Sequence, residues 1–127
     1  MSHISVFKTK IVNPNPELVR QVMEALAQHL NAKLLVNQSY RDWYGNIHAD
    51  HILVVEGRGI GVRVGEKLEI VGDPYGWENK FYSLRRQIIQ NYVHFALLQQ
   101  LQNMGYQPAN AQMLKDGTIV GEVMRHG

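Results

Sequence analysis

The chain contains no cysteine. That absence excludes a disulfide framework, a thiol nucleophile and a zinc site built on cysteine ligands. No apolar run approaches the ~20 residues that a membrane-spanning helix needs. The first residues, Met1 to Ser5, lack the basic and apolar regions of a secretory signal. We therefore expect a soluble, cytoplasmic protein that has no membrane partner.

The chain also lacks a large excess of either positive or negative charge. Lysine and arginine total 13 against 11 acidic residues, for a formal net charge of +2. A domain dedicated to duplex nucleic acid concentrates its basic residues into a stripe, whereas here they are scattered and Arg85-Arg86 is the only adjacent pair. The composition therefore permits a nucleic-acid partner without requiring one.

The length and the apolar content are those of one globular domain spanning residues 1–127. The chain has 127 residues, of which 45% are hydrophobic and 19% charged, and folding at this size hides about two-thirds of the surface of the unfolded chain. The alternation of apolar residues predicts the order β-α-β-β-β-β-α-β-β. We expect strands at 4–12, 33–36, 52–56, 60–64, 68–71, 111–114 and 118–124, and helices at 16–31 and 80–104.

The need to bury the apolar faces of the predicted helices and strands then predicts the fold class. Each helix has one apolar face to cover and each strand offers one, so we expect an α+β, two-layer sandwich: a mostly antiparallel sheet with both helices packed on one face. Charged residues on several predicted strands, such as Lys8, Arg63 and Glu69, indicate that the other face is partly exposed. The polar stretch from Asn37 to Asp50 reads as a connection between strands.

Two loops carry both tryptophans on similar local sequences, Asp42-Trp43-Tyr44-Gly45 and Asp73-Pro74-Tyr75-Gly76-Trp77. Tryptophan and tyrosine dominate the energy of protein interfaces, so the loops predict a partner-binding surface. Its members are Trp43, Tyr44, Tyr75, Trp77, Arg85 and Arg86.

Two other interpretations of these loops stay open. Each tryptophan could equally close one end of the core, because tryptophan is highly buried on average. The rings could also stack on single-stranded bases, with cations supplied by Arg41, Lys80, Arg85 and Arg86. Asp42 and Asp73 resemble turn formers by their position.

A metal site is the sharpest chemical candidate. His48 and His51 lie three residues apart, and Asp50 between them could ligate an ion or orient a ring. The competing interpretation is a pair of solvent-facing histidines where a loop enters a strand, because no third ligand is identifiable.

Other catalytic patterns are missing. The run Gly57-Arg58-Gly59-Ile60-Gly61 is followed by a predicted strand, whereas a dinucleotide-binding glycine loop requires a helix there. We assign these glycines to a hairpin turn and a close contact between strands. No serine has the glycine-flanked setting of a nucleophile elbow. We expect no catalytic residues and no cofactor, and the balance favours a protein that is not an enzyme.

Short motifs along nearly the whole chain resemble one family. They are Met1 to Ser5 with Lys8 to Ile11, Tyr44 to Asn46 with Ala49-Asp50, Gly61 to Val64, Trp77, and Asp116 to Ile119. The family is that of small uncharacterised proteins from cyanobacteria, other bacteria and algal plastids, where it is known as hypothetical chloroplast reading frame thirty-five. The resemblance implies a location in the cytoplasm or, if plastid-encoded, the plastid stroma. It also associates the family with an ATPase of the AAA type, but it implies no activity.

Together these observations favour a non-enzymatic protein-interaction or adaptor module. Its partner would be another protein, with an AAA-type ATPase as one candidate, or a second copy of the chain. The alternatives are a nucleic-acid-binding domain of low specificity and, with less support, a metal-dependent hydrolase centred on His48 and His51.

Overall fold

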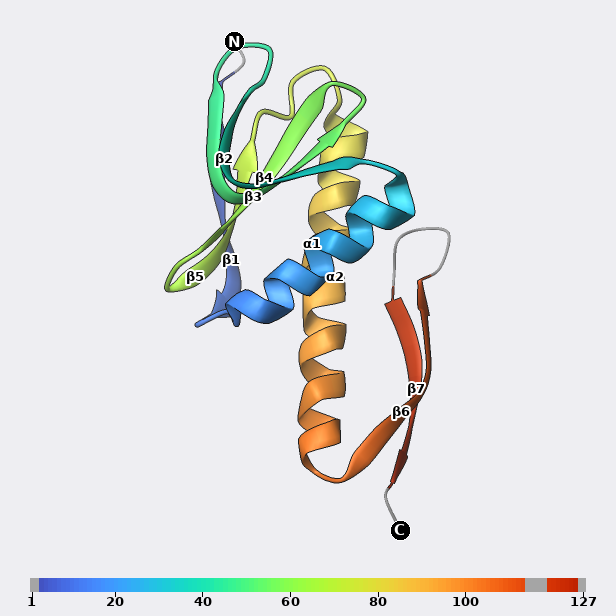
Figure 1. The fold of residues 1–127 in the computed structure, drawn as a ribbon. Coiled ribbons are helices and arrows are strands. Elements are labelled where there is room, and N and C mark those ends of the chain that lie inside the picture. The colour runs from blue at the N-terminus through green and yellow to red at the C-terminus, as the bar shows by residue number, and fades with distance from the viewer. Residues whose placement is uncertain (1–2, 114–118, 126–127) are drawn as a thin grey trace.

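The computed structural model describes residues 3–113 and 119–125. Within them, five strands form one antiparallel sheet in the order β1-β5-β4-β3-β2, while β6 and β7 pair separately. The order of elements along the chain confirms the predicted arrangement and the α+β class (Figure 1). The elements are β1 (Ser5–Val12), α1 (Pro16–Leu30), β2 (Lys33–Arg41), β3 (Asn46–Val55), β4 (Arg58–Val64), β5 (Lys67–Gly72), α2 (Glu78–Asn103), β6 (Tyr106–Met113) and β7 (Ile119–Arg125).

Both helices pack on the same face of the five-stranded sheet, as predicted. Met23 and Leu26 of α1 and Phe81 of α2 are fully buried there. Burying a side chain of this size contributes about 1.5–3 kcal/mol to stability, so this cluster is the main force that holds the helices on the sheet. The buried residues that the sheet adds to it are Leu53, Val55, Ile60, Val62, Leu68 and Ile70.

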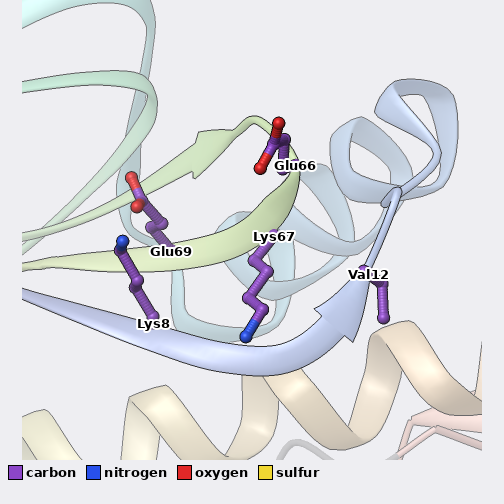
Figure 2. Close-up of a pocket in the computed structure, with 5 residues that line it drawn as sticks. All are labelled: Lys8, Val12, Glu66, Lys67 and Glu69. Carbon is purple, nitrogen blue, oxygen red and sulfur yellow. The ribbon is translucent and has the colours of Figure 1, made fainter.

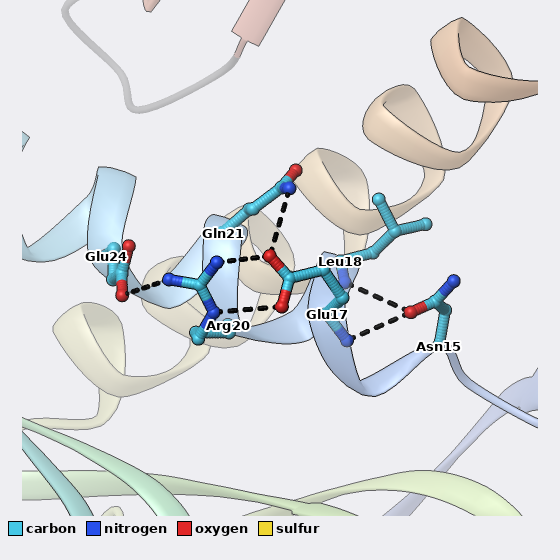
Figure 3. Close-up of polar contacts among 6 residues, drawn as sticks. All are labelled: Asn15, Glu17, Leu18, Arg20, Gln21 and Glu24. Carbon is cyan, nitrogen blue, oxygen red and sulfur yellow. Dashed lines mark hydrogen bonds and ion pairs between the residues drawn. The ribbon is translucent and has the colours of Figure 1, made fainter.

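Helix α1 begins where its sequence predicts. The side-chain oxygen of Asn15 accepts hydrogen bonds from the backbone N–H groups of Glu17 and Leu18, at 2.9 and 3.4 Å, and so caps the helix (Figure 3). Arg20 forms exposed ion pairs with Glu17 and Glu24, which add little because water screens them. The helix ends at Asn31, whose φ of 51° is left-handed.

A hairpin replaces the expected connection between Asn37 and Asp50. Strand β2 continues to Arg41 and β3 already begins at Asn46. The difference arises because polar residues on an exposed hairpin do not show the apolar alternation of a buried strand. Asn37 has a left-handed φ of 52°, and beyond it the far half of the hairpin, residues 38–49, bends over the second face of the sheet. We call residues 38–49 the arm.

The arm packs on glycines of β4. A Cβ atom at Gly61 would lie 2.8 Å from Cβ of Ala49, and one at Gly59 would lie 2.9 Å from Cδ1 of Ile47. Larger residues on β4 would therefore push the arm away. This confirms the predicted close strand contact at these glycines. Ile47 of the arm is fully buried against the sheet and forms a second small core with Ile52 and Val71, so the second face of the sheet is only partly exposed.

The C-terminal half of α2 extends past the sheet, and the hairpin of β6 and β7 lies near the far end of this helix (Figure 1). This hairpin confirms the predicted one, although β6 begins earlier, at Tyr106. The expected turn, Lys115 to Gly117, lies outside the described residues. Across residues 3–113 and 119–125, neither helix combines the length and the apolar character needed to cross a membrane.

Candidate interaction surface

Arg58 is the residue around which the two tryptophan-bearing loops are organised. It opens β4, directly after a two-residue turn in which Glu56 and Gly57 both have positive φ, 52° and 80°. Such a turn suits a tight hairpin because its twist matches that of the strands. The turn points the Arg58 side chain into the end of the molecule where both loops emerge, and the residue is only 4% exposed.

The guanidinium group of Arg58 bonds to both loops at once. Its Nε and Nη2 donate to the carboxylate of Asp42, at 2.8 and 3.2 Å, in a fork of two bonds. Its Nη1 donates to the carbonyl oxygen of Tyr75 at 2.7 Å, and Nη2 donates to that of Asp73 at 3.0 Å. Charge-assisted, bidentate bonds of this kind are among the strongest in proteins, so one side chain fixes the position of both loops.

Each loop is also closed locally. The backbone N–H of Asp42 donates to the carbonyl of Gly45 at 2.9 Å, and the side-chain Oδ1 of Asp73 accepts from the backbone N–H of Tyr75 at 3.0 Å. These contacts place both aspartates in turns, as their positions suggest. Asp42 has in addition the role of partner to Arg58, which its position does not reveal.

Three aromatic rings remain on the outside of this assembly. Trp43, Tyr44 and Tyr75 are 55%, 62% and 52% exposed, and we call them the aromatic patch. Tyr44 and Tyr75 meet edge to face, with centroids 6.1 Å apart, although they come from different loops. The guanidinium carbon of Arg58 lies 4.0 Å from the centroid of Trp43. A cation at that distance from an indole face is attractive, so Arg58 also supports this ring from beneath.

Trp77 has a different environment. Its indole Nε1–H donates to the carbonyl of Asp73 at 2.7 Å. The ring packs against the main core and meets Phe81 edge to face at 5.6 Å. The sequence left open whether each tryptophan faces a partner or closes one end of the core. Trp43 fits the first interpretation, and Trp77 fits the second.

The two arginines predicted beside the loops both lie on α2. The guanidinium of Arg85 lies 4.7 Å from the ring centroid of Tyr82 and 5.4 Å from that of Phe7, so it stacks on aromatic rings of α2 and β1. Arg86 is exposed on α2. The cation that the structure brings to the aromatic patch is instead Arg58.

The histidines of the proposed metal site occupy unlike environments. His48 is exposed, whereas His51 is 7% exposed. Burial lowers the pKa of His51, against the opposing charges of Asp50 and Glu24. Oδ2 of Asp50 accepts from the backbone N–H of Val64 at 2.7 Å.

Among the described residues, no group of three or more histidine, cysteine or acidic side chains is placed to hold a metal ion. The metal site stays a prediction, and elemental analysis of the purified protein would test it. A transition metal bound in stoichiometric amount would support the site, and its loss in His48→Ala would assign it.

Two shallow depressions lie on the sheet away from the patch. One, of about 330 Å³, is lined by Lys8, Val12, Glu66, Lys67 and Glu69 (Figure 2). Lys8 lies opposite Glu69 in the register of β1 and β5. The other, of about 360 Å³, includes His48, Asp50 and Arg63. Both mix the two signs of charge, so neither selects a ligand of one charge.

A family model with the description "Protein of unknown function (DUF1257)" matches residues 21–120, a range that contains both tryptophan-bearing loops and Arg58. Neither a search of curated proteins nor a search of solved structures returns a match.

Proposed function

We propose that this chain, which belongs to the DUF1257 family of proteins of unknown function, is a protein-interaction module whose docking site is the aromatic patch. The observation that carries the proposal is the pairing of three exposed rings with one buried cation. Arg58 holds both loops from inside, while Trp43, Tyr44 and Tyr75 stay outside. Exposed rings contribute little to the hydrophobic core, so core packing does not explain why these three residues are aromatic.

The energetics of interfaces favour such an arrangement. A few tryptophan, tyrosine and arginine residues supply most of the energy of a protein interface, and alanine in their place costs about 2 kcal/mol or more each. The rings of the patch are large and have few rotatable bonds, so burying them against a partner loses little side-chain entropy. The patch is therefore suited to contact a protein surface.

We further infer that the family is the one found in cyanobacteria, other bacteria and algal plastids, which the short motifs resemble. On that inference the protein works in the cytoplasm or in the plastid stroma. An adaptor role follows, with an AAA-type ATPase as the candidate partner. The support for this partner is the resemblance.

The test is affinity purification from the native cell with mass spectrometry. The tagged chain should bring down a partner in stoichiometric amount, and the variant carrying Trp43→Ala, Tyr44→Ala and Tyr75→Ala should lose it. Val12→Ala, another exposed apolar position, is the control and should retain it. Circular dichroism must show that all three proteins are folded. Equal recovery of the partner with the triple variant would refute the docking site.

Single-stranded nucleic acid is the second candidate. The flat rings of the patch could stack on bases, and Arg41, which precedes the first loop in sequence, is exposed. Binding of this kind weakens steeply with salt, because each neutralised phosphate releases counterions. A filter-binding titration with a mixed-sequence oligonucleotide distinguishes the two candidates. Retention at low salt that disappears in the Trp43→Ala variant would favour nucleic acid over a protein partner.

A further inference from the structure

The outward face of α2 carries an apolar stripe that lies opposite the core. Its members are Tyr82, Ile89, Val93, Leu97 and Met104. At 100° per residue they fall, on a helical projection, within an arc of about 80°. The exposed fractions of Tyr82, Val93, Leu97 and Met104 are 38%, 49%, 52% and 65%. Ile89 is half-buried, and Tyr82 also meets the ring of Phe7 on β1. A run of aliphatic side chains exposed along one side of a helix marks an interaction surface.

The stripe is symmetric about Val93. Ile89 and Leu97 lie four residues to either side of it, and Tyr82 and Met104 lie eleven residues to either side. Two such helices laid antiparallel with Val93 facing its own copy would pair Ile89 with Leu97 and Tyr82 with Met104, twice each. A two-fold interface requires this kind of self-complementary surface. The steps between stripe positions, including Arg86 and Gln100, are three or four residues, as in packed helix pairs.

Charge favours the same arrangement. From Gln87 to Met104 the helix has no aspartate, glutamate, lysine or arginine, so no like charges meet at the centre. Arg86 and Gln100 lie seven residues to either side of Val93, and the antiparallel pairing therefore sets each arginine against an amide. The two copies of Arg86 would be about 21 Å apart along the axis, beyond the screening length of about 8 Å. A parallel pair would instead put Arg86 against Arg86.

We propose that this stripe joins two copies of the chain into a two-fold symmetric dimer through antiparallel α2 helices. The contact would run from Tyr82 to Met104, about 33 Å of helix. The C-terminal half of α2 extends beyond the sheet (Figure 1). The strands β6 and β7 contact α2, and Val93 and Leu97 remain exposed on it. No residue of the stripe belongs to the aromatic patch.

Sedimentation equilibrium tests the dimer. The wild-type chain should dimerise, and Val93→Glu should weaken dimerisation about 100-fold, because it sets two carboxylates against each other at the two-fold axis. The control is Gln99→Glu, which adds the same charge at an exposed position on another side of α2; it should leave the equilibrium unchanged. A wild-type monomer at all concentrations, or equal dimerisation of wild type and folded Val93→Glu, overturns the proposal.

Because the native chain has no cysteine, disulfide crosslinking offers a second test, which reports which residues face each other and not how tightly the dimer is held. Under mild oxidation Val93→Cys should form a disulfide-linked dimer by itself, since only this position faces its own copy. Ile89→Cys alone should stay monomeric on a non-reducing gel, whereas a mixture of Ile89→Cys and Leu97→Cys should crosslink. Crosslinking of Ile89→Cys alone would mean a parallel pair and overturn the antiparallel geometry. Crosslinking of none of them, or capture of a different protein by the stripe, overturns the dimer.

Discussion

Arg58 and Asp42 form a buried, two-bond ion pair between the start of β4 and the first aromatic loop. The bonds are 2.8 and 3.2 Å long, and the two side chains are 5% and 0% exposed. Removing two charges from water is costly unless each satisfies the other. Here two further N–H groups of the arginine donate to carbonyls of the second loop, so four of its five N–H groups have a partner.

Asp42→Ala should therefore destabilise the protein by about 3–5 kcal/mol, because it leaves the buried guanidinium without its counter-charge. The free energy of unfolding from a urea titration measures the effect. Adding Arg58→Met to Asp42→Ala should recover much of the loss. Glu17→Gln breaks an exposed ion pair instead and should change little. A small effect of Asp42→Ala, comparable to that of Glu17→Gln, would contradict the buried pairing.

Gly61→Ala should lower stability by about 1–3 kcal/mol, since its new Cβ is forced against a neighbouring strand. The clash would be with Cβ of Ala49, at 2.8 Å. That atom cannot rotate away, so the arm must move. Gly65→Ala is the matched control, because a Cβ there would lie 3.9 Å from its nearest neighbour, the carbonyl of Lys67. Equal unfolding midpoints for the two variants would show that the arm does not pack on β4.

Stability should fall as the pH is lowered, in part through His51. Burial lowers the pKa of His51 in the folded state below its ordinary value of 6.5, while Asp50 and Glu24 oppose the shift and Arg20 adds to it. The unfolded chain then binds more protons near and below pH 6.5, so the contribution of His51 is complete above that value and is lost as the pH falls.

The variant His51→Gln should thus lose less stability than wild type between about pH 7.5 and 5. Thermal unfolding at each pH measures the difference. A wild-type slope that survives unchanged in the variant would show that the buried imidazole does not contribute.

The two tryptophans should differ in their access to solvent. Trp43→Phe leaves only Trp77, whose indole N–H is bonded to Asp73 and whose ring packs on the core. Trp77→Phe leaves only Trp43, which is exposed. Acrylamide should quench the fluorescence of Trp77→Phe more strongly than that of Trp43→Phe, and emission from Trp77→Phe should lie at longer wavelength. The reverse order would place Trp43 inside the protein and remove it from the patch.

Local pattern was enough to predict the layers of this fold. The first helix and the strands at 52–56, 60–64 and 68–71 follow from the spacing of apolar residues and from glycine turns, which act between near neighbours in sequence. Pattern failed at the arm. There, Ile47 is buried by contact with glycines of β4. The mostly polar sequence from Asn37 to Asp50 gives no pattern from which that contact could be predicted.

The same limit explains why Arg58 was missed. Between two glycines on a predicted turn it reads as an exposed residue, and its burial depends on Asp42 and Tyr75, which lie 16 and 17 residues away. Trp43, Tyr44 and Tyr75 could be proposed from the sequence because tryptophan and tyrosine in glycine-containing loops are informative by themselves. The cation beneath them required the tertiary structure.

The hydrogen bonds of Arg58 to both loops also affect the rate at which a partner could associate. One guanidinium bonds to both loops, so the backbone that carries the three outer rings should be ordered before any encounter. A partner would not have to wait for a mobile segment to order itself, and the complex would not carry that entropic cost. Association should then proceed as rigid-body docking, with differences in affinity among partners expressed mainly in how long each complex lasts.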